Sequence, residues 1–196
     1  EEMLEMSGLG SKVLQLRSVE FASKYNVPIR VLHAHKNQAL GTLITKEEKN
    51  MEGALISGIA FTKDEAEIMI KGVKDQPGVA AKILGPIGTA KIEIDMIVQN
   101  VGSNGLADFT FTVSRNTLKN AIKVIEKNKK NMGYSSYDTK NNIVKVSLIG
   151  VGMRSHAGIA SKMFKCLAKN KVNIRMISTS EIKISVVIDQ KNLEIA

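Results

Sequence analysis

Residues 74–80 (KDQPGVA) join a predicted strand to a predicted helix and could hold a small charged ligand. Asp75 can pair with an ammonium or a hydroxyl group. The unpaired backbone N–H groups of the first helical turn, from Gly78 to Ala81, suit a carboxylate. Gly78 lets a ligand approach the backbone closely. Asp75 followed by Pro77 and Gly78 is also an ordinary turn and cap, and the residues alone favour that structural role.

Gln99 lies at the end of the next predicted strand and offers both a donor and an acceptor. The sequence contains no spacing typical of a nucleophile–base pair, a metal-binding His/Cys cluster or a strand-to-helix phosphate loop. Residues 102–105 (GSNG) predict a hairpin turn between two strands. We therefore expect a binding module with no catalytic residues, no metal and no cofactor of its own.

An internal repeat provides the elements that position these residues. When the sequence is shifted by 80 positions, residues 72–100 align with residues 152–180 without a gap. The identical pairs are Gly72/Gly152, Gly78/Gly158, Ala80/Ala160, Lys82/Lys162, Lys91/Lys171, Ile94/Ile174, Met96/Met176 and Ile97/Ile177. This agreement indicates a duplication.

Each copy predicts a strand, a Gly-containing loop, an amphipathic helix and two further strands. In the first copy the elements are 66–73, 79–90, 92–98 and 107–113, followed by a helix at 115–130 and a short strand at 134–137. In the second copy they are 143–150, 159–170, 172–176 and 182–188, with a helix starting near Asp189. The order predicts an α+β fold with two ferredoxin-like βαββαβ modules, each an antiparallel sheet with helices on one face. Pro86 should bend or shorten the first helix.

The second copy lacks a fourth strand, whereas residues 54–61 (ALISGIAF) predict a strand with no place in the first copy. The simplest arrangement gives this strand to the second sheet. The first module, residues 63–139, is then inserted into a discontinuous second module formed by residues 54–62 and 140–196.

The segment before these modules reads as part of something larger. Residues 1–24 have apolar positions at helical spacing, interrupted at Gly8 and Gly10, and a short strand follows at 29–32. We assign residues 1–35 to the tail of an upstream domain and residues 36–53 to a linker.

Composition excludes several classes of protein. No apolar run approaches the length of a membrane span, and a single cysteine fits a reducing compartment, so the cytoplasm is expected. Cys166 should be buried beside Met163 and Leu167 on an apolar helix face. The net charge of +9 comes largely from a Lys-rich helix that we interpret as a solvated surface, without the interleaved aromatics of a nucleic-acid binder. Its lysines are Lys119, Lys123, Lys127, Lys129 and Lys130.

Several separate segments, in the right order, strongly resemble bacterial aspartate kinases. They are residues 2–6 (EMLEM), 10–14 (GSKVL), 17–20 (RSVE), 95–100 (DMIVQN), 108–112 (DFTFT) and 178–182 (STSEI). In that family the repeat is called the ACT domain, and it regulates catalysis by binding amino acids. The resemblance implies that residues 1–35 end a kinase domain whose ATP, magnesium and aspartate sites lie upstream. It also implies a homodimer, and Met51 resembles an internal start that yields a separate β subunit in some members.

The resemblance also implies effector-binding residues. Asp75, Gly78, Ala80 and Gln99 match the family's threonine-contacting positions, and Asn173 and Ile174 match those supplied by a facing second module. Ser180 and Glu181 match lysine-contacting positions, although Glu181 could equally be a polar strand edge. The segment from Met153 to His156 resembles the family too and makes Met153 a further candidate effector-binding residue. This segment has no acid in place of Asp75, and His156 alone is more often incidental.

Threonine, lysine or both are therefore the expected effectors, in feedback control of lysine, threonine and methionine biosynthesis. Two alternatives remain: an ACT-repeat sensor of another enzyme, and a ferredoxin-like RNA-binding module. An RNA binder would expose aromatic side chains on its sheet, for which Phe109 and Phe111 are the candidates.

Overall fold

The computed structural model describes residues 1–35, 40–46, 56–154 and 158–196, and the chain forms two compact units. Unit 1 comprises Glu1–Thr62, Val146–Val172 and Ile177–Val186. Unit 2 comprises Lys63–Lys145, Asn173–Met176 and Val187–Ala196. The Met51 start and His156 lie outside the described residues, as do most of the predicted linker and the first two residues of the predicted strand 54–61.

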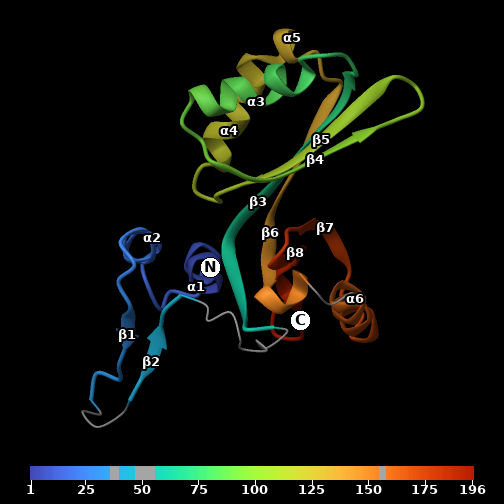
Figure 1. Cartoon of the computed structure of the whole chain (residues 1–196). Coiled ribbons are helices and arrows are strands. Elements are labelled where there is room, and N and C mark those ends of the chain that lie inside the picture. The colour runs from blue at the N-terminus through green and yellow to red at the C-terminus, as the bar shows by residue number, and fades with distance from the viewer. Residues whose placement is uncertain (36–39, 47–55, 155–157) are drawn as a thin grey trace. The chain divides into compact units, whose positions relative to one another are not determined.

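Unit 2 follows the predicted order of elements (Figure 1). They are β3 (Gly58–Lys74), α3 (Val79–Thr89), β4 (Ile94–Val101), β5 (Leu106–Val113), α4 (Leu118–Lys127), α5 (Lys129–Met132) and β6 (Ser136–Ile149). β5 pairs antiparallel with both β3 and β4. The strand order of the whole sheet is β4-β5-β3-β6-β8-β7, which makes β4 one of its two end strands among those described. The α+β ferredoxin-like fold is thus confirmed.

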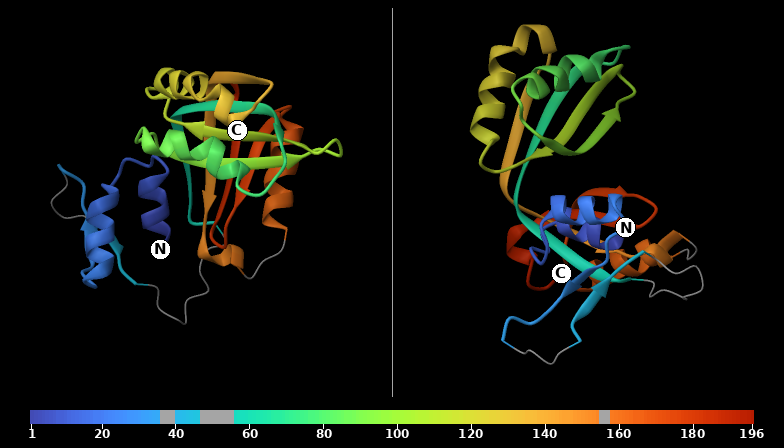
Figure 2. Two further views of the ribbon diagram at one scale, coloured as in Figure 1. Left: turned by 90° about the horizontal axis from the view of Figure 1, so that it is seen from above. Right: turned by 60° about the vertical axis from the view of Figure 1, so that its left-hand side comes forward.

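The core of unit 2 lies between the sheet and its helices, which cover one face (Figures 1 and 2). Alternate residues of each strand enter this core, because side chains of a strand point to opposite faces in turn. The helices contribute residues at spacings of about one turn. The most buried contributors are Ala66, Ile68 and Ile70 from β3, Phe109 and Phe111 from β5, Ile83 and Ile87 from α3, and Ala121 and Ile125 from α4.

The two repeated helices end in the same way. Lys91 and Lys171 have φ values of 56° and 57°, in the left-handed region that L-residues seldom adopt. Lys91 N donates to Gly88 O at 2.9 Å and Ile92 N donates to Ile87 O at 3.2 Å. This pattern is the Schellman motif, and the second copy repeats it with Lys171. The predicted helix 79–90 is confirmed as α3, and Pro86 lies inside it without ending it.

The predicted breaks within the two longest strands are wrong. Residues 54–61 and 66–73 were expected to be separate strands, but β3 runs continuously from Gly58 to Lys74. β6 likewise joins the predicted strands 134–137 and 143–150. The connecting residues are polar but include neither Gly nor Pro, so nothing in them interrupts an extended backbone.

Unit 1 holds α1 (Glu2–Gly8), α2 (Leu16–Lys24), β1 (Ile29–Val31), β2 (Thr42–Ile44), η1 (Val151–Arg154) and α6 (Ile159–Lys169). It also contains parts of β7 (Ile174–Thr179) and β8 (Lys183–Asp189), and η2 (Gln190–Asn192) follows in unit 2. Met6 and Leu9 pack with Ala60 and Ile149, so the first helix belongs to the same compact unit as much of the second repeat. The predicted domain boundaries stay a prediction.

Three further local expectations are corrected. β2 forms within the predicted linker and pairs antiparallel with β1. β2 has only three residues, which are too few to show the alternation that predicts a strand. The predicted helix 115–130 is two helices that meet at Asn128, whose Nδ2 donates to Val124 O. Cys166 is exposed, because the buried stripe of α6 follows Ile159, Met163 and Leu167 and turns Cys166 away.

Candidate functional site

The loop between β3 and α3 is positioned by backbone bonds. Asp75 N donates to Gly105 O at 2.9 Å, which ties the loop to the β4–β5 hairpin. Val79 N donates to Gln76 O at 3.1 Å, and Gly78 has a φ of 87°. A Cβ atom on Gly78 would meet nothing within 4 Å, so glycine is required there by the backbone and the space beside it is open.

No side chain caps the start of α3. The first N–H groups of a helix have no acceptor inside the helix, so those of Ala80 and Ala81 can receive an anion. Asp75 and Ala80 are both exposed, which leaves a carboxylate and a set of N–H donors on the same accessible turn.

Gln99 lies at the same end of the sheet as this loop. Val73 of β3 and Val101 of β4 both pair with Ala107 of β5, so β3 and β4 run parallel and end at the same level. Gln99 is exposed two residues before Val101, and Asp75 follows two residues after Val73. The structure thus brings Asp75, Gly78, Ala80 and Gln99 to one end of unit 2.

The remaining predicted residues divide between the two units. Asn173 and Ile174, at the start of β7, belong to unit 2, where Asn173 is exposed and Ile174 half-buried. Met153 lies half-buried in η1 of unit 1. Ser180 and Glu181 form an exposed turn of unit 1, held by a 2.8 Å bond from Ser180 N to Lys183 O.

A group of charged residues in unit 2, of which Lys145 and Glu65 are buried, was not predicted from the sequence. Lys145 of β6 forms ion pairs with Glu65 of β3, at 3.1 Å, and with Asp95 of β4. Burial alone would lower the pKa of Lys145, yet the hydrogen bond to Asp95 and the charge of Glu65 raise it above its usual value. Burial raises the pKa of Glu65 against the opposing effect of Lys145.

A second charged centre lies around Arg175 of β7. Its guanidinium donates two hydrogen bonds to Glu67 of β3, both at 3.0 Å, and lies 3.6 Å from Asp189. The hydrogen bond to Glu67 raises the pKa of Arg175. Asp189 also pairs with Lys140 at 2.9 Å, and the hydrogen bond from Lys140 lowers the pKa of Asp189.

We call these seven residues the ionic cluster: Glu65, Glu67, Asp95, Lys140, Lys145, Arg175 and Asp189. One sequence signal could have revealed part of it. Positions 65 and 145, like positions 95 and 175, are related by the 80-residue shift and carry opposite charges in the two copies.

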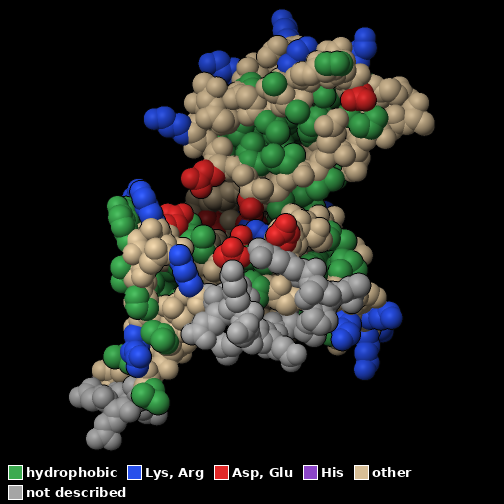
Figure 3. Space-filling view, viewed as in Figure 1, with side chains coloured by type: hydrophobic (Ala, Val, Ile, Leu, Met, Phe, Trp, Pro, Cys, Tyr) green, Lys and Arg blue, Asp and Glu red, His purple; other side chains and the backbone are tan. Residues whose placement is uncertain are grey.

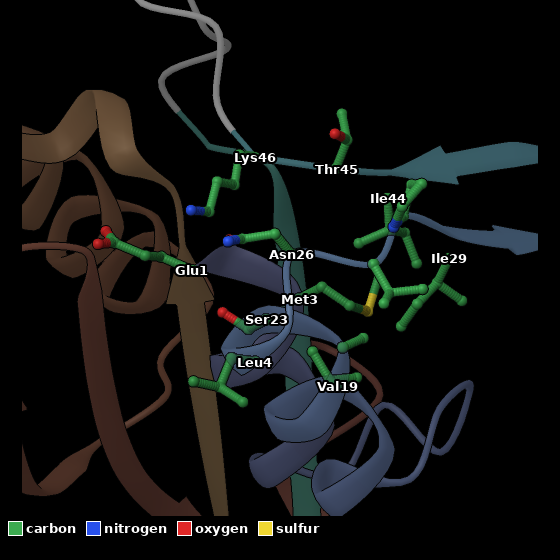
Figure 4. Close-up of a pocket in the computed structure, with 13 residues that line it drawn as sticks. Glu1, Met3, Leu4, Val19, Ser23, Asn26, Ile29, Ile44, Thr45 and Lys46 are labelled. Carbon is green, nitrogen blue, oxygen red and sulfur yellow. The ribbon is translucent and has the colours of Figure 1, made fainter.

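A cavity of about 160 Å³ lies elsewhere, in unit 1, between α1, α2 and the β1–β2 hairpin (Figure 4). Met3, Val19, Ile29 and Ile44 give it an apolar wall. None of the predicted effector-binding residues lines it. Within the described residues no group of three or more His, Cys, Asp or Glu side chains could hold a metal ion.

The lysines of α4 and α5 are exposed, and Figure 3 shows Lys and Arg side chains projecting from the helical part of unit 2. Phe109 and Phe111, the candidates for stacking on RNA, are only 1% and 0% exposed, which argues against the RNA-binding alternative. None of the helices in the described part of the chain is long and apolar enough to span a membrane.

Comparisons with known proteins show similarity to ACT domains and to aspartokinases. Family models of the ACT domain match residues 67–129 and residues 146–196. An aspartokinase of Pseudomonas aeruginosa is 60% identical over 198 residues, which cover 100% of this chain and 48% of that protein. The chain therefore spans about half the length of this relative.

Solved structures add two similarities. The ligand-free regulatory subunit of aspartate kinase from Thermus thermophilus is 35% identical, with a TM-score of 0.68, over 72% of this chain and 93% of that one. Aspartokinase III of E. coli, in complex with lysine and aspartate, is 20% identical, with a TM-score of 0.71, over 98% of this chain and 42% of that one. The E. coli protein shares the fold.

Proposed function

Because this chain belongs to the aspartokinase family and carries its two ACT domains, we propose that it senses a free amino acid and thereby controls an aspartate kinase. The observation that carries the proposal is that Asp75, Gly78 and Gln99 lie at the same end of unit 2 as the uncapped start of α3. An amino acid presents a carboxylate and an ammonium together. This end of the unit offers backbone N–H donors for the ligand's carboxylate and the Asp75 side chain for its ammonium.

We assign threonine to this end of unit 2. Its carboxylate would accept hydrogen bonds from the N–H groups of Ala80 and Ala81, and its ammonium or hydroxyl would donate to Asp75. The Gln99 amide can satisfy a remaining donor or acceptor. Asn173 and Ile174 would complete the contacts from the second repeat.

Lysine is the second proposed effector, with Met153, Ser180 and Glu181 as its candidate contacts. Glu181 supplies a negative charge for the ammonium of a lysine side chain. The E. coli structure named above holds lysine, which is a property of that protein. Its similarity to this chain supports the fold in which such a site would be built.

The kinase reaction itself is assigned to a segment upstream of this chain, with ATP and magnesium as its cofactors. Effector binding would shift the enzyme between conformations of different activity and take no part in the chemistry. We also propose that the chain forms a homodimer through its ACT domains. Light scattering at micromolar concentration with threonine or lysine present tests this, and a monomer under all these conditions would contradict it.

Calorimetric titration of this chain with threonine, with lysine and with both tests the effector assignment. Asp75→Ala should weaken threonine binding about tenfold to a hundredfold, because a charge-assisted bond worth about 1.5–3 kcal/mol is lost. Gln99→Ala should cost less, since a neutral amide is removed. Asp138→Ala is the matched control, because it deletes an exposed Asp of the same unit that pairs with Lys71.

The same change in the full-length enzyme gives the functional outcome. Asp75→Ala should raise the threonine concentration required for half inhibition and leave uninhibited turnover nearly unchanged. The isolated chain should form no aspartyl phosphate from aspartate and ATP. An unchanged half-inhibition concentration for threonine and lysine, separately and together, would show that the Asp75 loop is only a turn.

A further inference from the structure

The ionic cluster crosses the face of the sheet opposite the helices of unit 2. Glu65 and Glu67 alternate along β3 with Ala66 and Ile68, which enter the helix-covered core. Glu65, Glu67 and Lys145 are only 5–6% exposed, so three charged groups are buried on the face that the helices do not cover. Such groups are stable only when they are paired with good geometry, and here each has a partner of opposite charge.

Side-chain contacts hold β4 at Asp95 and Met96, on the same side of unit 2 as the ionic cluster. Its pairing with β5 shifts register between Ile94 and Ile97, so the ladder is irregular at Asp95 and Met96. Met96 N donates instead to Thr112 Oγ1 at 3.3 Å, and the Asp95 carboxylate is held by Lys145. Side chains therefore hold the start of β4 where the regular ladder is interrupted.

The β7 strand is held in a related way. It stands at the other end of the strand order and has β8 as its neighbour in the described sheet. Arg175 fixes the strand to Glu67 with two parallel hydrogen bonds, a geometry that specifies orientation as well as position. Met96 and Met176, each next to a cluster residue, pack together with Ile143 and Val187 in one buried group.

The charges at equivalent repeat positions are opposite, which makes the arrangement specific. Asp95 in the first copy corresponds to Arg175 in the second, and Glu65 corresponds to Lys145. Exchanging the two strands would place Arg175 against Lys145 and Asp95 against Glu67, so like charges would meet. The electrostatics therefore favour one placement of each copy.

β4 and β7 also carry candidate effector residues. Gln99 lies four residues after Asp95 on β4, and Ile174 is the residue before Arg175 on β7. We infer that Lys145 and Arg175 are positioning residues, whose ion pairs hold β4 and β7 in place and so set the affinity for the effector without touching it. This inference rests on the proposed function for its effector, while the holding of the strands is an independent property.

Hydrogen exchange of this chain without effector tests the positioning directly. Lys145→Met should speed exchange of the amides of residues 94–98, and Arg175→Met that of residues 173–178, each by about tenfold relative to α3, which equals ~1.4 kcal/mol of local stability. Lys71→Met is the matched control and should change neither segment, since its ion pair with Asp138 joins β3 to β6 on the surface. Equal acceleration over the whole unit would mean general destabilisation and would overturn the inference.

A double variant distinguishes the loss of the Arg175–Glu67 ion pair from the destabilisation caused by leaving one buried charge unpaired. Glu67→Gln/Arg175→Met removes both partners and should fold even where a single change does not, because no charge is left alone. Exchange of residues 173–178 should stay fast in this variant. A return to the wild-type rate would show that Arg175 does not hold the strand.

Titration with threonine and lysine then measures the consequence. Arg175→Met and Lys145→Met should weaken binding by about 2- to 30-fold at a temperature where both variants are folded. Arg175→Lys should recover part of the loss, because it restores the charge without the paired geometry. Unchanged affinity despite faster local exchange would overturn the link to the effector. Failure of the wild-type chain to bind either amino acid would refute the proposed function, and the exchange result would still decide the positioning.

Discussion

The two faces of the sheet in unit 2 are built from the same strands and differ in what holds them. On the helix-covered face, Phe109, Phe111 and Ile68 are almost fully buried among aliphatic side chains. On the opposite face, Glu65, Glu67 and Thr112 are also buried but polar. Apolar burial stabilises the folded state without regard to direction, whereas buried ion pairs stabilise it only when the opposite charges are correctly placed. The helix-covered face therefore provides stability, and the opposite face provides specificity of position.

The largest expected effect comes from the apolar face. Phe111→Ala should lower the free energy of unfolding by about 3–5 kcal/mol, because it leaves a cavity in a closely packed core. Urea denaturation followed by circular dichroism measures the change. Phe61→Ala is the control, since Phe61 is 47% exposed and its loss should cost far less. Equal losses of stability in the two variants would show that the helix-covered face is not the main source of stability.

A smaller effect is expected from a polar residue on the opposite face. Thr112→Val keeps the shape of the side chain but removes the oxygen that accepts the Met96 N–H. Leaving that donor unpaired should cost about 1–3 kcal/mol and should speed exchange of the Met96 amide. If stability and exchange both remain unchanged, the hydroxyl has no part in holding β4.

The stability contributed by the charged face should also depend on pH, with opposite signs for Glu65 and Asp189. The raised pKa of Glu65 means that its favourable contribution exists below its unfolded value of 4.5 and is lost as pH rises through the folded value. The lowered pKa of Asp189 means that its contribution exists above 3.8 and is lost as pH falls.

Stability measured across this acidic range should therefore show opposite trends in two variants. Relative to wild type, Glu65→Gln should gain stability as pH rises from the acidic range towards neutrality, and Asp189→Asn should lose stability over the same range. The Asp189 effect should stay below about 1 kcal/mol, because its ion pairs are partly exposed. Parallel trends in both variants would contradict the assigned signs.

The smallest effect concerns the helix that covers the apolar face. Lys91→Gly should raise the free energy of unfolding by about 0.5–1 kcal/mol, because glycine adopts the left-handed conformation at the helix end without strain. Lys171→Gly should act alike in the second repeat. Thermal unfolding measures both changes, and Lys82→Gly, inside α3, should instead destabilise.

Sequence patterns predicted the modules well, because their signals are local. The alternation around Phe109 and the spacing of Ile83 and Ile87 reflect one buried face, which the structure confirms. Strand ends were less predictable, since polar residues 62–65 continue β3 without a turn signal. The ion pairs of Lys145 were not predicted, because they depend on which strands are close together in the folded sheet. Local sequence patterns do not specify that arrangement.

The candidate site was predicted in a similar way. The turn at Asp75 and the position of Gln99 follow from local patterns, and register brings them to one end of the sheet. Their effector-binding role came from resemblance to aspartate kinases and stays a prediction. Burial of Cys166 was predicted wrongly, because residues one position apart on a helix point about 100° apart.

The placement of the first helix has a consequence for the order in which the chain can fold during synthesis. Glu2 accepts a hydrogen bond from Val151 N, 149 residues away, and Glu5 pairs with Lys183, 178 residues away. Such contacts cannot form until Val151 and Lys183 have left the ribosome. The segment Lys63–Lys145, by contrast, is contiguous and can collapse earlier, since domains tend to fold as units as they emerge. The first helix is thus synthesised before the segment Lys63–Lys145 but finds its native partners after that segment can collapse.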